Sequence, residues 1–390
     1  MRLTTTSALS LPDDGKLPLT LPGLRQAGRR IGPMFVFALL PGLLLTVMLA
    51  GSVHDHFAFD FHQFWEGGRD VIEGNSPYPP ASSLPRGGDP SLDPIAIQNT
   101  FLFPYPAPAA IAMVPFGALP FPVAAALFVL LSIAAVFGAL RLLDVADWRC
   151  YGLAFASIAT LSAVRLGTFT PFLVLGLAAA WRFRDRKLIV ATAVASLILL
   201  KLFLWPLLIW LVLSRRAASA ALTLAIVAIA GLASWAVIGF AGLSSYPELL
   251  STLAASVQGK GWSTVALGLS LGVSAAVAKV LTVVIAGAGL AVTSRRDFWS
   301  FTVAISAAIL MSPIVWLHYF LLLVVPLAIA FPALAPAWFI PLALWAWPFP
   351  ETGGDIWKIA LGLAVLTAVC ATTLLSSKRS APPSALKTSG

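Results

Sequence analysis

The sequence predicts an all-α polytopic membrane protein with about twelve transmembrane helices and an extracytoplasmic loop that carries an interfacial amphipathic helix. The first reason is composition: 59% of the 390 residues are hydrophobic and 11% are charged, whereas soluble domains have roughly 25% charged residues. The second reason is that long apolar runs recur from one end of the chain to the other. The third is that clusters of arginine and lysine separate these runs, as positively charged cytoplasmic loops do.

The two ends of the chain differ in composition from the rest. Residues 1–30 are rich in Ser, Thr and Pro and carry arginines just before the first apolar run, which predicts a disordered cytoplasmic tail. A first span is expected over residues 31–53. Because apolar runs continue to the far end, this span is not merely the signal peptide of a secreted domain. We therefore expect a single polytopic membrane domain over residues 31–375 and a second cytoplasmic tail over residues 376–390.

The first extracytoplasmic loop, residues 54–106, is the one long polar segment, and Pro and Gly interrupt it repeatedly. It holds seven of the sixteen acidic residues. Apolar residues recur at helical spacing from Phe61 to Ile72 and polar residues fill the other face, which predicts an amphipathic helix at the membrane interface. Gly74 is expected to end this helix, and Asp60 stands at its entrance.

The remaining spans follow from the prolines and the charge clusters. Prolines divide residues 104–122 into pieces too short to cross a membrane, so we expect a re-entrant or interfacial segment there, followed by a span near residues 123–143. Beyond it, the positive-inside rule places each Arg/Lys cluster on the cytoplasmic side, and the chain must cross out and back between clusters. This predicts helical hairpins over residues 150–181, 188–213, 217–293, 298–331 and 337–375. The total is about twelve crossings, with both termini cytoplasmic.

Lys201 lies in the middle of the predicted hairpin over residues 188–213, within the apolar sequence LILLKLFLWP. Each arm has only about thirteen residues, fewer than the roughly twenty that a straight span requires. We expect either a segment that dips into the membrane or broken helices packed inside the protein. An ionisable residue at this depth is a candidate functional residue, and the alternative is a lysine that extends to the outer interface.

Two further segments are expected on the outer side. Residues 241–263 are polar enough to form an external loop with a short helix, and His318 stands immediately before a span. Ser312, Pro313 and Trp316 precede this histidine in a sequence typical of an interfacial aromatic belt. Composition alone therefore favours a structural role for His318.

Charge, cysteine and histidine content exclude several classes of function. The net charge of +9 does not indicate nucleic-acid binding, because such binding needs basic residues clustered on a solvated domain. The two cysteines exclude a disulfide framework and a cysteine metal site. His54, His56 and His62 are crowded, but their spacing matches no metal site, and there is no Asp-x-Asp pair. We therefore expect neither a metal nor a cofactor.

Four segments carry a resemblance to a known family: DFHQFWEGGRDVIEGNSPYPP, FLFPYPAPAAIAMVPFGALP, LKLFLWPLLIWLVLSRR and SPIVWLHYFLLLVVPL. Together they resemble glycosyltransferase family 87, membrane enzymes of the GT-C architecture, over about residues 31–375. The resemblance implies a multi-pass protein of the plasma membrane. It also implies transfer of mannose or arabinofuranose, with mannose favoured, from a polyprenyl-phosphate donor to a lipid-linked glycan acceptor outside the membrane.

The resemblance also assigns roles to single residues. The family's catalytic aspartate falls on Asp60, its histidine near the donor phosphate on His318, and its lysine ahead of a proline on Lys201. The chain departs from the family where a G-Q-x-N element reads GTFT at residues 167–170, and where an N-Q-S-x-x-G pattern keeps only its Ser and Gly at residues 256–259. These departures concern the sugar and the acceptor more than the reaction class.

The expected chemistry needs one carboxylate and one or more cations. The phosphate of such a donor leaves as an anion without receiving a proton, so the reaction needs a base for the acceptor hydroxyl and cations for the phosphate. Asp60 suits the base, and direct attack inverts the anomeric carbon; the alternative is that Asp60 and Gln63 form a helix cap. Arg165 and Lys260 are further candidates for phosphate binding, because each is a lone cation on the outer side.

Three residues of the first loop are candidates for acceptor binding. Glu66 and Asp70 project from the polar face of the amphipathic helix, where they either meet acceptor hydroxyls or simply solvate that face. Tyr78 belongs to a Pro-rich segment that either lines the site or forms an ordinary turn.

Two other classes of function remain open on the sequence alone. A transporter also has many crossings, broken helices and deep lysines, here Lys201 and Lys279, but no internal repeat is visible and a transporter has little need of a long polar loop. A non-catalytic lipid-binding subunit would leave the acidic and aromatic residues around Asp60 unexplained.

Overall fold

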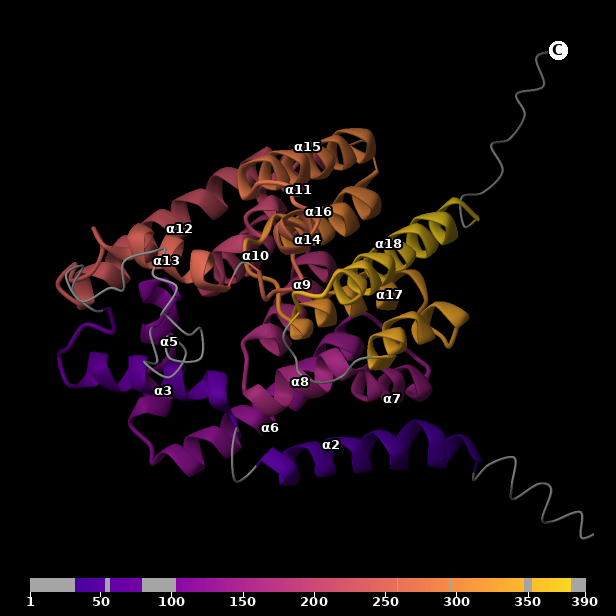
Figure 1. Cartoon of the computed structure of the whole chain (residues 1–390), viewed down its shortest axis with the longest axis horizontal. Coiled ribbons are helices and arrows are strands. Elements are labelled where there is room, and N and C mark those ends of the chain that lie inside the picture. The colour runs from indigo at the N-terminus through magenta and orange to yellow at the C-terminus, as the bar shows by residue number, and fades with distance from the viewer. Residues whose placement is uncertain are drawn as a thin grey trace, which may run out of the picture.

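The computed structural model describes residues 32–52, 57–78, 103–257, 259–294, 296–346 and 353–379. Within these residues every regular element is a helix and there is no strand (Figure 1). The predicted helical class is therefore confirmed. The predicted N-terminal tail, residues 1–30, and most of the predicted C-terminal tail lie outside the described residues.

Five helices of the described chain are long and apolar enough to cross a membrane. The first two match the spans predicted at residues 31–53 and 123–143. The first of the five is Gly32–Gly51, which contains η1 (Phe35–Leu39) and most of α2 (Leu40–Ser52). The other four are α6 (Phe121–Leu142), α12 (Ala217–Val237), α15 (Ala275–Thr293) and α18 (Ile356–Arg379). A sixth span is possible if α8 (Ile158–Leu166) and α9 (Thr170–Arg182), bent by 117°, count as one.

The other predicted crossings correspond to shorter apolar helices, so the twelve-span count stays a prediction. These helices fall below the roughly twenty residues that a straight span requires. They are α5 (Ala107–Gly117), α10 (Lys187–Leu200), η3 (Leu202–Leu204) with α11 (Pro206–Leu213), α16 (Asp297–Met311), η4 (Leu317–Leu323) with α17 (Val324–Ala330), and η5 (Pro336–Ala346). Between them lie α7 (Trp148–Ala156), α13 (Tyr246–Val257) and α14 (Thr264–Ser270). As expected, α13 is a short helix within residues 241–263.

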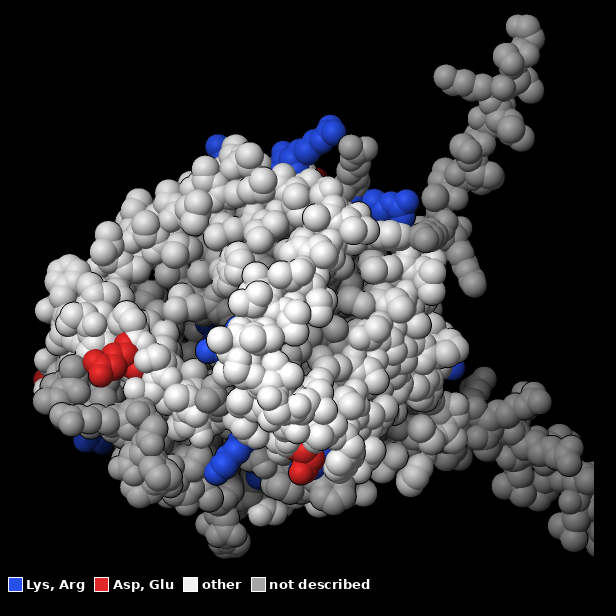
Figure 2. Space-filling view, turned by 45° about the horizontal axis from the view of Figure 1, so that its top comes forward, with Lys and Arg blue, Asp and Glu red and all other residues white. Residues whose placement is uncertain are grey.

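Ion pairs join several loops that the positive-inside rule placed on one side. An Arg216 guanidinium nitrogen lies 2.8 Å from Asp297 and another lies 2.8 Å from Asp185. Arg184 lies 3.3 Å from the same Asp297. One ionic network therefore joins the loop after α9, the loop after α11 and the start of α16. Much of the face drawn in Figure 2, by contrast, carries no charged side chain.

Helices α10 and α16 both begin near this ionic network, and their C-terminal ends both reach the same cavity. α10 begins at Lys187 and is capped by Lys201, and α16 begins at Asp297 and is capped by Ser312. At about 1.5 Å per residue, each helix spans roughly 20 Å. Their far ends therefore lie at most about 20 Å from the ionic network, and this is where the candidate site is found.

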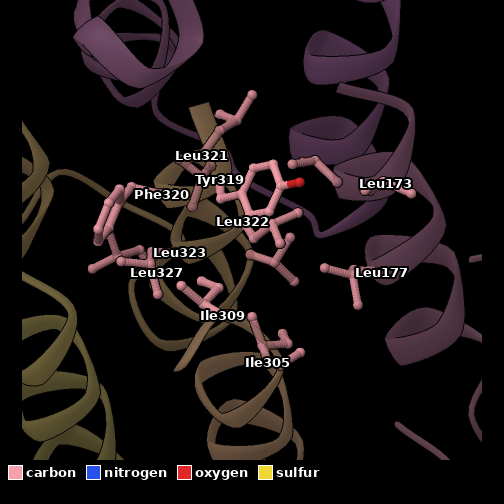
Figure 3. Close-up of a cluster of buried hydrophobic side chains, with 14 of the residues drawn as sticks. Leu173, Leu177, Ile305, Ile309, Tyr319, Phe320, Leu321, Leu322, Leu323 and Leu327 are labelled. Carbon is pink, nitrogen blue, oxygen red and sulfur yellow. The ribbon is translucent and has the colours of Figure 1, made fainter. Parts of the chain in front are cut away.

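The core around η4 is tightly packed. Figure 3 shows side chains of α9, α16, η4 and α17 meeting there, among them Leu173, Ile305 and Leu322. These three side chains are buried. Tyr319 belongs to the same cluster and carries the one oxygen atom visible in the view. The cluster fixes η4, which carries both His318 and Tyr319.

The predicted amphipathic helix is present as α3 (Phe59–Ile72), with Phe61 and Phe64 buried. It packs against α5 (Figure 1). A Cβ atom at Gly68 would overlap the backbone of Met113, so the two helices approach as closely as they do because this position has no side chain. The chain leaves the helix through Gly74, whose φ is +76°, as the sequence predicted.

Candidate active site

A cavity of about 260 Å³ lies at the far ends of α10 and α16. Its walls come from α3, residues 104–106, residues 201–203, α13 and residues 312–319. Segments that are widely separated in the sequence therefore form one site. Its polar side chains include Asp60, Gln63, Lys201 and Ser312.

Asp60 lines this cavity from the first turn of α3. The N-cap residue of α3 is Ala58, in the left-handed conformation and without a side-chain cap hydrogen bond, so the interpretation of Asp60 as a helix cap is wrong. The Ala58 N–H instead donates to the Arg165 carbonyl at 2.9 Å. Gly167 has a φ of +68°, and a Cβ atom added to it would lie 2.6 Å from the Phe61 Cβ. The bend between α8 and α9 thus sets the position of Asp60.

Lys201 lines the same cavity and is only 8% exposed. It is the C-cap of α10, where its φ of −153° takes the backbone out of the helix. Its ammonium lies 4.1 Å from the centroid of the Tyr319 ring. Lys201 is therefore buried within the protein and does not extend to the surface. It interacts electrostatically with Asp60, so the structure brings these two predicted residues together.

His318 lies beside the cavity but does not belong to its lining. It is 2% exposed, and its ring centroid is 4.9 Å from that of Tyr319. Within the described part of the chain, neither of its ring nitrogens has a hydrogen-bond partner. It does interact electrostatically with Lys201. The histidine is thus close to the charged site but is separated from the open space.

The two weaker cation candidates are placed elsewhere. Arg165 holds the start of α3 through its backbone carbonyl. Lys260 follows α13, and its N–H donates to the Val257 carbonyl at 2.9 Å. Neither side chain lines the cavity.

Glu66 and Asp70 lie on α3, as predicted, but not on the cavity wall. The Glu66 carboxylate is 3.6 Å from Nδ1 of His62. Burial, followed by the negative charges of Glu66 and Glu73, raises the pKa of Asp70. These carboxylates therefore lie on α3 outside the cavity wall.

Tyr78 supports the cavity wall from behind. It is 5% exposed, and its hydroxyl donates to the Tyr105 carbonyl at 2.6 Å. Its ring stacks on that of Trp235, with centroids 4.7 Å apart. The Tyr246 hydroxyl donates to the neighbouring Pro104 carbonyl at 3.1 Å. Two tyrosines therefore fix the backbone segment that borders the cavity.

Sequence analysis did not identify several residues of the site. Gln63 follows Asp60 by three positions, so the helical period places both on one face, and this spacing was a signal that could have been used. The side chain of Gln63 lines the cavity. Tyr105, Phe203 and Tyr319 also line it, but their meeting depends on tertiary packing and leaves no local pattern.

Much of the lining is apolar. One face of α13 contributes Tyr246, Leu250, Leu253 and Val257, whose spacing of four, three and four residues follows the helical period. Trp316 also lines the cavity. A cavity that combines a carboxylate, an ammonium and an apolar wall suits an amphiphilic ligand.

These features define a class: a multi-pass helical membrane protein with an internal cavity where a carboxylate and an ammonium meet beside apolar walls. The chain belongs to glycosyltransferase family 87, because the family model matches residues 103–313, more than half of its 390 residues. It is therefore a glycosyltransferase that acts on a sugar donor and a glycan acceptor. No curated protein and no solved structure matches the chain.

The matched range contains Lys201, α13 and the segment at residues 104–106. It ends before His318 and begins after Asp60. The role assigned to Asp60 therefore depends on the sequence motif and on its place in the cavity wall, and the role assigned to His318 depends on the sequence motif.

Proposed function

We propose that the protein is a GT-C-type inverting glycosyltransferase that moves a sugar, with mannose favoured, from a polyprenyl-phosphate donor to a lipid-linked glycan acceptor. The reaction takes place on the extracytoplasmic side of the plasma membrane. The observation that carries this proposal is that Asp60 and Lys201, from distant parts of the chain, line the same cavity. The apolar wall formed by α13 suits the hydrocarbon part of such a donor.

Asp60 acts as the general base. Its carboxylate accepts the proton of an acceptor hydroxyl while the hydroxyl oxygen forms a bond to the anomeric carbon. The bond between that carbon and the phosphate oxygen breaks on the opposite face, and the configuration is inverted. Polyprenyl phosphate departs as an anion, so no general acid is needed.

Lys201 stabilises the departing phosphate. An ammonium in a site with little water stabilises an anion more strongly than it does in bulk solvent. We give Lys201 the main role because its side chain lines the cavity, whereas both ring nitrogens of His318 are buried. His318 assists from behind Tyr319, and Arg165 and Lys260 contribute positive charge from further away.

The arrangement of charges supports the proposed side of the membrane. The ionic network around Arg216 and Asp297 marks one end of α10 and α16, and the cavity lies at the other end. If the arginine-rich end faces the cytoplasm, the cavity opens toward the opposite side.

The test is transfer by the purified protein in lipid nanodiscs, with labelled polyprenyl-phosphate mannose or arabinofuranose as donor and a membrane lipid extract as acceptor. Asp60→Asn removes the base and keeps the shape, so we expect a loss of about 10²–10⁴-fold in rate. Glu248→Gln, an exposed carboxylate on α13, is the matched control and should retain the rate. Full activity in Asp60→Asn contradicts the proposal.

No observation on the structure favours a transporter or a non-catalytic subunit over an enzyme. Vesicles that contain the protein provide the comparison, because a transporter accumulates a labelled solute without forming a new glycolipid. Incorporation of label into lipid, analysed by mass spectrometry and by NMR of the anomeric proton, also reports the sugar, the acceptor and the stereochemistry.

A further inference from the structure

Three aromatic rings surround the ammonium of Lys201. The nitrogen lies 4.1 Å from the ring centroid of Tyr319, 5.5 Å from that of Tyr105 and 5.9 Å from that of Phe203. All three residues line the cavity together with Lys201. We call these three rings the aromatic cage.

The walls of the aromatic cage are fixed by their own contacts. The rings of Phe203 and Tyr319 stack with centroids 5.0 Å apart and an interplanar angle of 7°. The ring of Tyr105 packs edge-on against Phe64 at 4.8 Å and against Phe169 at 5.4 Å. Rotation of any of these rings would break contacts in the core, so the cage holds its shape before a ligand arrives.

In the part of the chain that the structure describes, the ammonium of Lys201 contacts aromatic rings and not a carboxylate. Across the described residues, its ammonium has cation–π contacts but no hydrogen bond and no ion pair at bonding distance. A buried cation without a partner is costly. Ring faces attract a cation without occupying its N–H donors, so the three donors of Lys201 remain available in the ligand-free protein.

We infer that the aromatic cage positions Lys201 so that its ammonium points into the cavity. There it binds the phosphate of a lipid-linked sugar and, after transfer, the phosphate of the departing lipid. This inference rests on the proposed function. It names Tyr319 and Phe203 as positioning residues that act through Lys201. Their rings, and not the Tyr319 hydroxyl, supply the effect.

Single substitutions separate positioning from simple packing. Tyr319→Leu and Phe203→Leu remove a ring, and we expect each to raise the donor KM by about tenfold, in line with a desolvated cation–π contact. The acceptor KM should change much less. Tyr319→Phe keeps the ring and should restore the donor KM. Trp205→Leu is the matched control, because Trp205 belongs to the same segment but is exposed and does not line the cavity.

A binding measurement reports the same property without catalysis. Undecaprenyl phosphate should raise the melting temperature of the wild-type protein, and undecaprenol, which lacks the phosphate, should do so much less. Tyr319→Leu and Phe203→Leu should lose most of the difference between the two lipids. Where Tyr319→Leu fails to fold, Phe203→Leu carries the test, because Phe203 is only half-buried.

The outcomes distinguish this inference from the proposed function. If transfer occurs but both leucine variants have wild-type donor KM and lipid discrimination, the cage inference is overturned and the proposed function stands. An equal loss in Tyr319→Phe and Tyr319→Leu also overturns it, because the hydroxyl would then be the essential group. If the wild-type protein transfers no sugar but discriminates the two lipids through the cage, the proposed function fails and the anion site remains.

Discussion

Asp60, at the start of α3, and Lys201, at the end of α10, line the same cavity although they are far apart in the sequence. Their charges interact, yet Lys201 forms no direct ion pair. The space between them is therefore open to a ligand. In the proposed reaction the two groups act on the two ends of one displacement, Asp60 on the incoming hydroxyl and Lys201 on the departing phosphate.

Lys201→Met should stabilise the ligand-free protein while it impairs transfer. The ammonium is buried without a direct ion pair, and burying a charge without such a partner is costly, so an apolar side chain of similar size removes that cost. We therefore expect a higher melting temperature together with a large loss of activity. Lys279→Met is the control, because Lys279 is exposed. A lower melting temperature for Lys201→Met would mean that the ammonium has stabilising partners.

Tyr78→Phe should affect both stability and catalysis. It leaves the Tyr105 carbonyl without its donor in a buried place, which costs about 1–3 kcal/mol. Because that carbonyl belongs to the cavity wall, the rate should also fall. Tyr151→Phe removes a bond to the Val145 carbonyl that is 3.0 Å long, and neither of these residues lines the cavity, so it should change the melting temperature alone. Equal kinetics in the two variants would exclude a role for Tyr78 in the site.

Gln63→Ala should weaken the binding of a sugar-bearing substrate, since the Gln63 amide lines the cavity and can both donate to and accept from hydroxyl groups. We expect the KM for donor or acceptor to rise about tenfold, as the loss of roughly one good hydrogen bond does. Glu66→Gln, one helical turn further on and off the wall, should have the smaller effect. The reverse order would favour Glu66 as the acceptor-binding residue.

Gly167→Ala should displace the start of α3. A side chain at this left-handed position costs roughly 1–2 kcal/mol, and its Cβ would also lie 2.6 Å from the Phe61 Cβ. Gly239→Ala isolates the backbone cost, because Gly239 has a φ of +64° with no atom within 4 Å of the added Cβ. We expect Gly167→Ala to lower the melting temperature further than Gly239→Ala and to reduce transfer. Thermal unfolding and rate measurements on both variants provide the comparison.

The elements predicted correctly from the sequence are those that depend on a few consecutive residues. The spacing of apolar residues from Phe61 to Ile72 predicted α3, and the long apolar runs predicted the first two spans. The positive-inside rule grouped loops that the ion pairs of Arg216 do bring together. Each of these predictions needs only a few consecutive residues and a known environment.

Other features depend on contacts between distant segments. Helices α10 and α16 are shorter than the roughly twenty residues of a straight span, so their positions depend on packing against other helices and not on the length of the apolar run. The aromatic cage around Lys201 takes its rings from three separate segments. No local sequence pattern indicates that these segments meet. The location of His318 behind Tyr319, off the cavity wall, likewise required the packing around η4.

The length of α10 limits how far the reaction centre can stand from the arginine-rich edge. Roughly 20 Å of helix is shorter than the hydrocarbon layer, which is about 30 Å thick. In the proposed function, where the arginine-rich edge lies at the cytoplasmic boundary, Lys201 is placed beneath the outer headgroups and the sugar reaches it from within the bilayer. That depth suits a sugar carried on a membrane lipid, as the proposed function requires, better than a freely dissolved sugar nucleotide.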